Sequence, residues 1–212
     1  MLQLKEYTLK EFESFLVRQG EPAFRARQLF SWVYQKGVSD LDRMLNLPAV
    51  LRQKLQRTVS LSALSLVEKQ VSSDGTEKFL FRLHDGHLIE TVAIPAQGRV
   101  TGCVSSQAGC KFGCAFCCSG KGGFKRDLTC AEIVDQIVFL RFQSSGRELT
   151  HLVFMGMGEP LDNYDNVLKA IRMINAPDPD WPETLRGPAA DVYARWGDEL
   201  KPRGFGLAAR DV

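Results

Sequence analysis

Three cysteines in one short loop limit what this chain can fold into more than any other feature of its sequence. Cys110, Cys114 and Cys117 follow the spacing C-x3-C-x2-C. A 4Fe-4S cluster usually takes four thiolate ligands, one on each iron. A loop with three cysteines leaves one iron open, and the amino and carboxylate groups of S-adenosylmethionine can chelate an open iron. One-electron reduction would then release a 5′-deoxyadenosyl radical, so the loop predicts a cluster that binds S-adenosylmethionine.

Two other interpretations of these cysteines stay open at this point. Zinc sites more often combine pairs of cysteines and need four ligands, and Cys103 or Cys118 could provide the fourth. The other alternative is a set of unrelated buried thiols. Disulfides are rare in cytosolic proteins, where a tight group of cysteines more often binds a metal or does redox chemistry. The spacing favours the iron–sulfur cluster over zinc.

The part of the chain ahead of the cysteine loop divides into two segments of different pattern. Residues 1–60 have helical periodicity, with a capping box formed by Thr8 and Glu11, and are expected to form a small helical domain. Residues 61–98 contain short β-prone runs separated by Asp-Gly pairs. Asp-Gly between such runs is a strong hairpin signal. This second segment is therefore expected to form antiparallel strands.

The remainder, residues 99–212, is predicted to be an α/β core. The order strand, loop, helix repeated twice is that of a parallel sheet or barrel. Residues 177–203 interrupt this order with several prolines and are predicted to be an irregular insertion. The expected elements are a strand at 99–105, a helix at 131–143, a strand at 149–155 and a helix at 164–174.

A second candidate loop, MGMGEP at 155–160, follows the second of these strands. Loops at the C-terminal ends of parallel strands line the ligand-binding face of such folds. The glycines allow close approach of the backbone, and the Glu159 carboxylate could accept hydrogen bonds from the ammonium group of a ligand. An ordinary tight turn before a helix has the same pattern. Together with the cysteine loop, however, the motif favours a cofactor-binding loop.

Composition and charge set the class of protein and suggest a partner. Hydrophobic residues make up 44% and charged residues 25%, which is ordinary for a soluble globular protein. Charges from Lys5 onward exclude a secretory signal, and no apolar run is long enough to span a bilayer, so a cytoplasmic protein is predicted. Residues 1–60 contain ten Lys/Arg and six Asp/Glu, a net charge of +4. This excess suits contact with RNA phosphates, although a solvated helix surface would also explain it.

Several separated motifs carry a family resemblance. They are FRARQ at 24–28, NLP at 46–48, LIETVAIP at 88–95, CVSSQAGC at 103–110, MGMGEP at 155–160 and NV at 166–167. In this order they resemble the radical S-adenosylmethionine superfamily and, within it, the RlmN family of adenine-C2 RNA methyltransferases. The resemblance covers about residues 4–176, and weakly 204–212. A family of C8 methyltransferases is closely related, and the motifs do not separate the two.

The resemblance implies a fold, a substrate and partners. The fold would be a partial TIM barrel, here with its first βα units. The substrate would be one adenine in 23S rRNA and the adenine next to the anticodon in some tRNAs. An external one-electron reductant would be needed, and the full-length protein would be a monomer. In the implied route, one S-adenosylmethionine methylates a C-terminal cysteine, and a second one generates the radical that activates this methyl group.

The resemblance also implies roles for individual residues of this sequence. A base removes the proton of the adenine ring, and a second cysteine resolves the adduct by forming a disulfide. The matched positions are Cys110, Cys114 and Cys117 as cluster ligands, Gly158 and Glu159 as S-adenosylmethionine contacts, Glu90 as proton acceptor and Cys103 as the disulfide-forming cysteine.

The chain departs from the family in one respect. The family's methyl-carrying cysteine lies in its C-terminal part, whereas the last cysteine here is Cys130, which is expected to be a packing residue at a helix start. We therefore expect a truncated or split protein that cannot methylate adenine alone. The alternative is a non-catalytic module that binds RNA or zinc.

Overall fold

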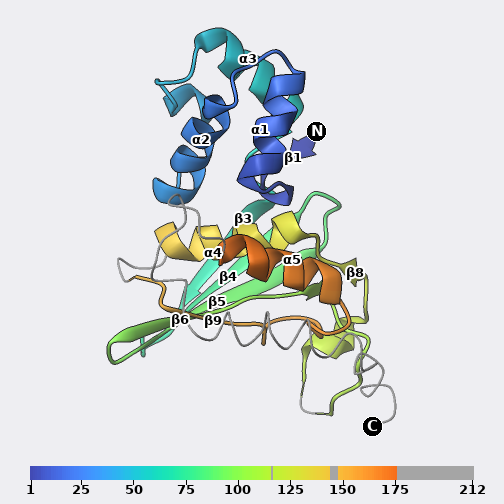
Figure 1. Ribbon diagram of the computed structural model, residues 1–212. Helices are drawn as coiled ribbons and strands as arrows, with labels where there is room; N and C mark the ends of the chain where they lie inside the picture. Colours follow the sequence, from blue (N-terminus) through green and yellow to red (C-terminus); the bar gives the residue numbers. More distant parts are fainter. Residues whose placement is uncertain (116, 144–147, 176–212) are drawn as a thin grey trace.

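The computed structural model describes residues 1–115, 117–143 and 148–175. The predicted insertion at 177–203 and the weak match at 204–212 lie outside these residues. The described part is a mixed α/β fold, in which a helical module packs on a helix-covered sheet (Figure 1). The predicted α/β fold class is confirmed by this architecture.

The N-terminal module is helical, as its periodicity predicts. The capping box at the start of α1 is present, because Thr8 accepts from the backbone of Glu11 and the Glu11 carboxylate accepts from the backbone of Thr8. A short parallel pair, β1 (Leu2–Gln3) with β2 (Val59–Ser60), joins the two ends of the module and was not predicted. The helical segments are η1 (Leu4–Glu6), α1 (Leu9–Arg18), α2 (Phe24–Phe30), a π-helical turn at Ser31–Gln35, η3 (Leu41–Arg43) and α3 (Ala49–Thr58).

The strands that follow form one mixed sheet in the order β3-β4-β5-β6-β9. The first four run antiparallel, and β9 lies parallel to β6. The hairpin between β5 and β6 crosses residue 98, so the antiparallel segment and the start of the α/β core share this sheet. The division into three domains stays a prediction. The strands are β3 (Leu64–Val71), β4 (Glu77–Leu83), β5 (Leu88–Ala96), β6 (Arg99–Cys103) and β9 (His151–Val153).

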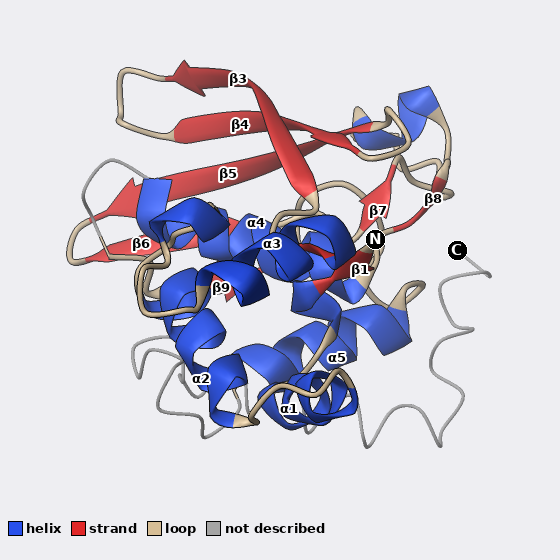
Figure 2. Cartoon of the chain, turned by 90° about the horizontal axis from the view of Figure 1, so that it is seen from above, coloured by secondary structure: helices blue, strands red, loops and turns tan. Residues whose placement is uncertain are grey.

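Two helices cover one face of the sheet (Figure 2). α4 (Cys130–Gln143) connects β6 to β9, and α5 (Tyr164–Ile174) packs on α4. The sequence predicts a helix at 131–143, and in the structure the buried residues of α4 lie nearly all round it. The reason is that α4 lies between two partners. Phe139 packs on Phe79 and Phe81 of the sheet, with ring centroids 5.1 and 4.8 Å apart. The opposite side of α4 faces the helical module (Figure 1).

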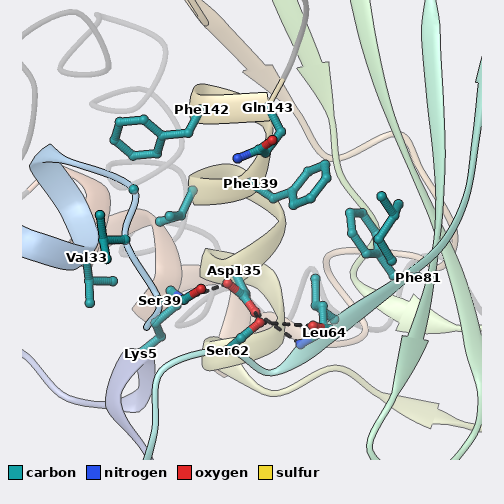
Figure 3. A pocket seen from close by; sticks show the side chains of 14 residues that line it. Lys5, Val33, Ser39, Ser62, Leu64, Phe81, Asp135, Phe139, Phe142 and Gln143 are labelled. Atoms are coloured by element: carbon teal, nitrogen blue, oxygen red, sulfur yellow. Dashed lines mark hydrogen bonds and ion pairs between the residues drawn. The ribbon is translucent and has the colours of Figure 1, made fainter. Parts of the chain in front are cut away.

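A buried ion pair ties the module to α4 (Figure 3). Lys5 is 3% exposed, and its Nζ lies 2.6 Å from Oδ1 of Asp135. The second carboxylate oxygen of Asp135 accepts hydrogen bonds from the Ser62 hydroxyl and from the backbone N–H groups of Ala63 and Leu64, at 2.8, 2.6 and 3.1 Å. A cavity of about 230 Å³ lies beside this pair, between the module, α4 and the sheet.

No helix within the described residues is long and apolar enough to cross a membrane. Cys130 is fully buried, with its sulfur 3.4 Å from the Met173 sulfur, which confirms the prediction of a packing residue.

Candidate functional site

The cysteine loop leaves the sheet after β6 and closes on itself through a short strand pair. β7 (Gln107–Ala108) and β8 (Arg126–Asp127) pair antiparallel at the base of the loop. Between them lies the 3-10 helix η4 (Ser119–Gly122). Gly109 has a φ of +77°, and a Cβ at this position would collide with the carbonyl oxygen of Gly123. The two arms of the loop therefore touch at a point where only glycine fits.

The three predicted ligands are free thiols of unequal exposure. Cys114 is exposed, and Cys110 and Cys117 are partly buried. Hydrogen bonds from the backbone and side chain of Ser119 lower the pKa of the Cys117 thiol. The thiolate is the form that binds metals, so this environment favours the ligand form of Cys117.

The structure does not bring the three sulfurs to one point. Among the described residues, no three His, Cys, Asp or Glu side chains lie close enough to hold one metal ion. Thiolates repel one another, so a cation is needed to draw three of them together. The donor set itself fits a 4Fe-4S cluster, because one loop at the edge of the sheet offers three thiols and none of them is consumed by a disulfide.

The MGMGEP loop after β9 packs directly on the residues that lead into the cysteine loop. A Cβ on Gly156 would lie 2.8 Å from the backbone nitrogen of Ser105, and one on Gly158 only 2.5 Å from Cβ of Gln107. The carbonyl of Met157 accepts a hydrogen bond from the Gln107 N–H at 3.1 Å. These glycines allow the loop to pack closely on the residues that lead into the cysteine loop, and their contact with S-adenosylmethionine stays a prediction.

Glu159 lies in the turn that follows these glycines. Its backbone N–H donates to Oε1 of Gln107 at 3.0 Å, and its carboxylate Oε1 accepts from the Leu161 N–H at 3.0 Å. The side chain is partly exposed. One carboxylate oxygen thus stabilises the turn, and the turn fixes where the carboxylate group lies.

Glu90 and Cys103 lie on the same face of the sheet. In the antiparallel register Cys103 is opposite Val92, and Glu90 is two residues from Val92 along β5. Side chains two residues apart on a strand, and those directly opposite across a pair, share a face. The neighbouring residue Gly102 faces α4, since a Cβ there would meet Leu140. Glu90 and Cys103 therefore point away from the helices.

The two residues differ in environment. The Glu90 carboxylate is partly exposed and forms an ion pair with Lys78 on the adjacent strand, with an N–O distance of 3.0 Å. Cys103 is 9% exposed, and burial raises the pKa of its thiol. At neutral pH the Cys103 sulfur is therefore protonated.

A buried hydrogen-bond network behind the two loops was missed by the sequence analysis. The Gln136 side-chain oxygen, on α4, accepts from the Ser105 N–H and the Thr91 hydroxyl, both at 2.8 Å. The Ser105 hydroxyl donates to the Glu90 carbonyl at 2.6 Å and accepts from the Met157 N–H at 2.9 Å. The sequence carries only a weak signal for this network, the polar pair Asp135-Gln136 between apolar residues of the predicted helix.

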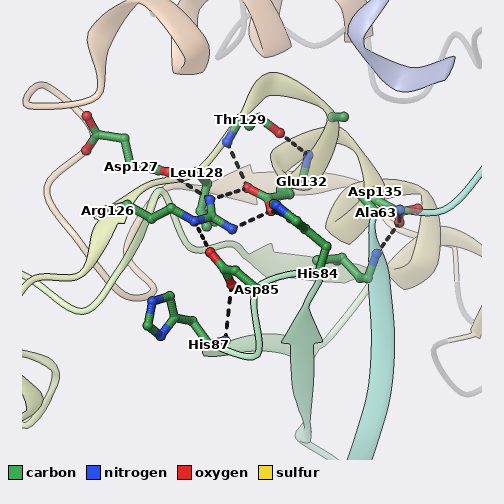
Figure 4. Close-up of polar contacts among 12 residues, drawn as sticks. Ala63, His84, Asp85, His87, Arg126, Asp127, Leu128, Thr129, Glu132 and Asp135 are labelled. Carbon is green, nitrogen blue, oxygen red and sulfur yellow. Dashed lines mark hydrogen bonds and ion pairs between the residues drawn. The ribbon is translucent and has the colours of Figure 1, made fainter. Parts of the chain in front are cut away.

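Charged side chains brace the return arm of the cysteine loop (Figure 4). The Arg126 guanidinium binds both oxygens of Glu132 at 2.8 Å and also pairs with Asp85, which lies in the β4–β5 turn. The Arg126 side chain holds the pKa of Asp85 at about 2, below its usual range. Glu132 in turn caps α4 by accepting from the Thr129 N–H at 2.9 Å, as its sequence spacing predicts.

Replacing Asp85 with Asn is expected to lower the free energy of unfolding at pH 7 by no more than about 1 kcal/mol, because the pair is partly solvated. A depressed pKa stabilises the fold above the unfolded value near 4 and loses this effect as the pH falls towards about 2. Urea unfolding at pH 7, 4 and 2.5 would show the difference between the two proteins shrinking across this window. A difference that stayed constant with pH would contradict the assignment.

The strand–cysteine loop–helix order, the parallel pair β6–β9 and the glycine loop after β9 together define a radical S-adenosylmethionine domain. The model of the radical SAM superfamily matches residues 104–198. A second model, the ribosomal RNA large subunit methyltransferase N-terminal domain, matches residues 2–61. The chain belongs to the RlmN family.

Individual relatives agree with this assignment. The chain is 50% identical over 175 residues to the dual-specificity RNA methyltransferase RlmN of Syntrophobacter fumaroxidans, covering 82% of this chain and 51% of the relative. It is 44% identical over 177 residues to that of Geotalea uraniireducens, covering 84% of this chain and 51% of the relative. The chain thus spans about half the length of the curated relatives it matches.

A solved structure shows the same fold. The crystal structure of a radical SAM methyltransferase from Sphaerobacter thermophilus superposes with a TM-score of 0.81 at 40% identity. The match covers 85% of this chain and 53% of that protein.

Proposed function

We propose that this chain carries the cluster site of a radical S-adenosylmethionine RNA methyltransferase that acts on C2 of adenine in 23S rRNA and in tRNA. The observation that carries the proposal is the cysteine loop with its three free thiols, held against the MGMGEP loop. The named relatives, dual-specificity RNA methyltransferases, support the reaction and the RNA substrate. The basic helical module supports contact with RNA phosphates.

Each site residue has a defined task in this proposal. Cys110, Cys114 and Cys117 hold the 4Fe-4S cluster, and the loop containing Gly158 and Glu159 binds S-adenosylmethionine. When bound and supplied with an electron by an external reductant, these groups provide radical chemistry that abstracts a hydrogen atom. The remaining steps involve Glu90 and Cys103, on the face of the sheet that points away from α4.

Glu90 accepts the proton that leaves the adenine ring. Its carboxylate is accessible and lies 3.0 Å from the Lys78 ammonium on the adjacent strand. Cys103 lies on the same face and would form a disulfide with the methyl-carrying cysteine that the resemblance implies. The bond from that second sulfur to the carbon on the adenine would break, and the proton of the Cys103 thiol would be replaced by a proton on this carbon, which becomes the methyl group. Because its thiol is protonated at neutral pH, Cys103 is protected from reaction with other thiols or disulfides before a substrate is in place.

The cluster can be tested on the chain itself. After anaerobic reconstitution with iron and sulfide, we expect about four irons for each chain and the broad visible absorbance of a 4Fe-4S cluster. Cys114→Ala should lose most of both, because only two ligands remain. Cys118→Ala is the matched control, since this exposed neighbour lies outside the proposed ligand set and should retain the iron. One zinc and no iron in the purified chain, or equal iron in both variants, would overturn the proposal.

The 212 residues alone are expected not to methylate adenine. Residues 131–212 contain no cysteine that could carry the methyl group. The reconstituted chain, a reductant and S-adenosylmethionine would be incubated with an rRNA transcript and with tRNA, and the nucleosides analysed by mass spectrometry. Any 2-methyladenosine or 8-methyladenosine would contradict this expectation, and the product would also identify the carbon that is methylated.

A further inference from the structure

Gln107 lies where three segments of the site meet, and its side chain is hydrogen-bonded to all of them. The residue is fully buried, three positions before the first cysteine of the loop. Its amide nitrogen donates to Asp127 at 2.8 Å and to Asp162 at 2.9 Å. Its amide oxygen accepts from the Glu159 N–H at 3.0 Å. One side chain therefore joins the base of the cysteine loop, the MGMGEP turn and the approach to α5.

The contacts continue from Asp162 into the cysteine loop itself. The Lys111 ammonium lies 2.7 Å from the same Asp162 oxygen that Gln107 binds. Lys111 directly follows Cys110, and its Nζ also lies 4.5 Å from the centroid of the Phe124 ring. A continuous line of polar contacts thus runs from the neighbour of a proposed cluster ligand to the backbone of the proposed S-adenosylmethionine loop.

Backbone packing leaves this arrangement little freedom. Gly158 has a φ of +99°, and a Cβ there would lie 2.5 Å from Cβ and 2.7 Å from the backbone nitrogen of Gln107. The amide group is also chemically specific. It faces two carboxylates with its NH₂ group and one N–H with its oxygen, a combination that a carboxylate or an apolar side chain of equal length does not provide.

We propose that Gln107 is a positioning residue that fixes the MGMGEP loop relative to the cysteine loop and thereby sets the affinity for S-adenosylmethionine. The inference rests on the proposed function, because it requires that the two loops hold the cluster and the cofactor. Side chains that orient a metal site from outside its ligand shell typically change affinity or activity about 10–100-fold when they are replaced.

The test uses the reconstituted chain and separates iron content from cofactor affinity. Gln107→Met keeps the length and loses every hydrogen bond of the amide, and Gln107→Glu keeps the shape but places a third carboxylate beside Asp127 and Asp162. Both should retain the iron of the unaltered chain. Both should raise the Kd of S-adenosylmethionine about 10-fold or more, measured as the change that the cofactor produces in the electron paramagnetic resonance spectrum of the reduced cluster.

Two substitutions of exposed lysines test the same inference if replacement of the buried Gln107 unfolds the chain. Lys111→Met breaks the far end of the contact line without entering the core, and should raise the same Kd about 2–5-fold. Lys121→Met is its matched control, since this exposed lysine of the same loop forms no ion pair with the described residues.

The outcomes distinguish this inference from the proposed function. If the unaltered chain takes up no iron, the proposed function fails and the inference falls with it. If the unaltered chain binds iron and cofactor, and Gln107→Met, Gln107→Glu and Lys111→Met bind S-adenosylmethionine equally well, only the inference is overturned. If the Gln107 variants show no cooperative melting, the lysine variants decide. The inference is then overturned if Lys111→Met and Lys121→Met have the same Kd for S-adenosylmethionine.

Discussion

Replacing Lys5 with Met is expected to lower the free energy of unfolding by about 3–5 kcal/mol. The Lys5 ammonium is buried between Asp135, 2.6 Å away, and the carbonyl of Leu61. Without it, the Asp135 carboxylate remains buried and loses its counter-charge. Backbone and hydroxyl donors from residues 62–64 compensate only in part. Urea unfolding followed by circular dichroism measures the change.

The matched control is the exposed ion pair of Glu6, the residue that follows Lys5. Lys169 lies 3.2 Å from Glu6 and is 42% exposed. Surface pairs contribute about 0–1 kcal/mol, so Lys169→Met should change the stability by no more than that. Equal effects of the two lysine substitutions would show that burial of the Lys5–Asp135 pair does not determine its contribution.

Gly109→Ala is expected to abolish most cluster binding while leaving the fold of the sheet intact. The residue has a φ of +77°, which costs a residue with a Cβ about 1–2 kcal/mol. The added methyl group would also collide with the carbonyl oxygen of Gly123, so the two arms of the loop would have to move apart at this point. Because Gly109 precedes Cys110, opening the base displaces the first proposed ligand. Iron content after reconstitution should fall severalfold.

Gly113→Ala is the control for this substitution. Gly113 lies in the same loop, between two of the proposed ligands, but its φ is not positive, and no atom of the described residues lies within 4 Å of the position its Cβ would take. This variant should retain the iron. Near-equal iron in both variants would mean that the contact between the two arms does not shape the loop.

The elements that depend on local signals could be predicted from the sequence. The capping boxes of Thr8 with Glu11 and of Thr129 with Glu132 both form, because each needs only residues three positions apart. The same holds for the hairpins at the Asp-Gly pairs, where the turn chemistry is contained in the turn itself.

Features that depend on partners distant in the sequence could not be predicted. The apolar residues of α4 predict a buried helix, but not which partners bury its two sides, and one of these partners is the helical module. Asp135 is an ordinary acidic residue until Lys5, 130 positions away, neutralises it. Gln107 likewise gains its place from Asp127 and Asp162, which only the folded loops bring to one point. Composition and motif spacing do not show which distant residues contact one another in the folded chain.

The burial of α4 on two sides, by the sheet and by the helical module, links the sequence of this helix to that of the module. Gly37 of the module packs directly on the Phe142 ring, and Lys5 pairs with Asp135, so one side of the helix is adapted to the module alone. A relative without such a module would expose this side to water and would need polar side chains along it. We therefore expect the residues on this side of α4 to be apolar in relatives that have the module and polar in relatives that lack it. An evolutionary exchange of the module would require this helix to change with it.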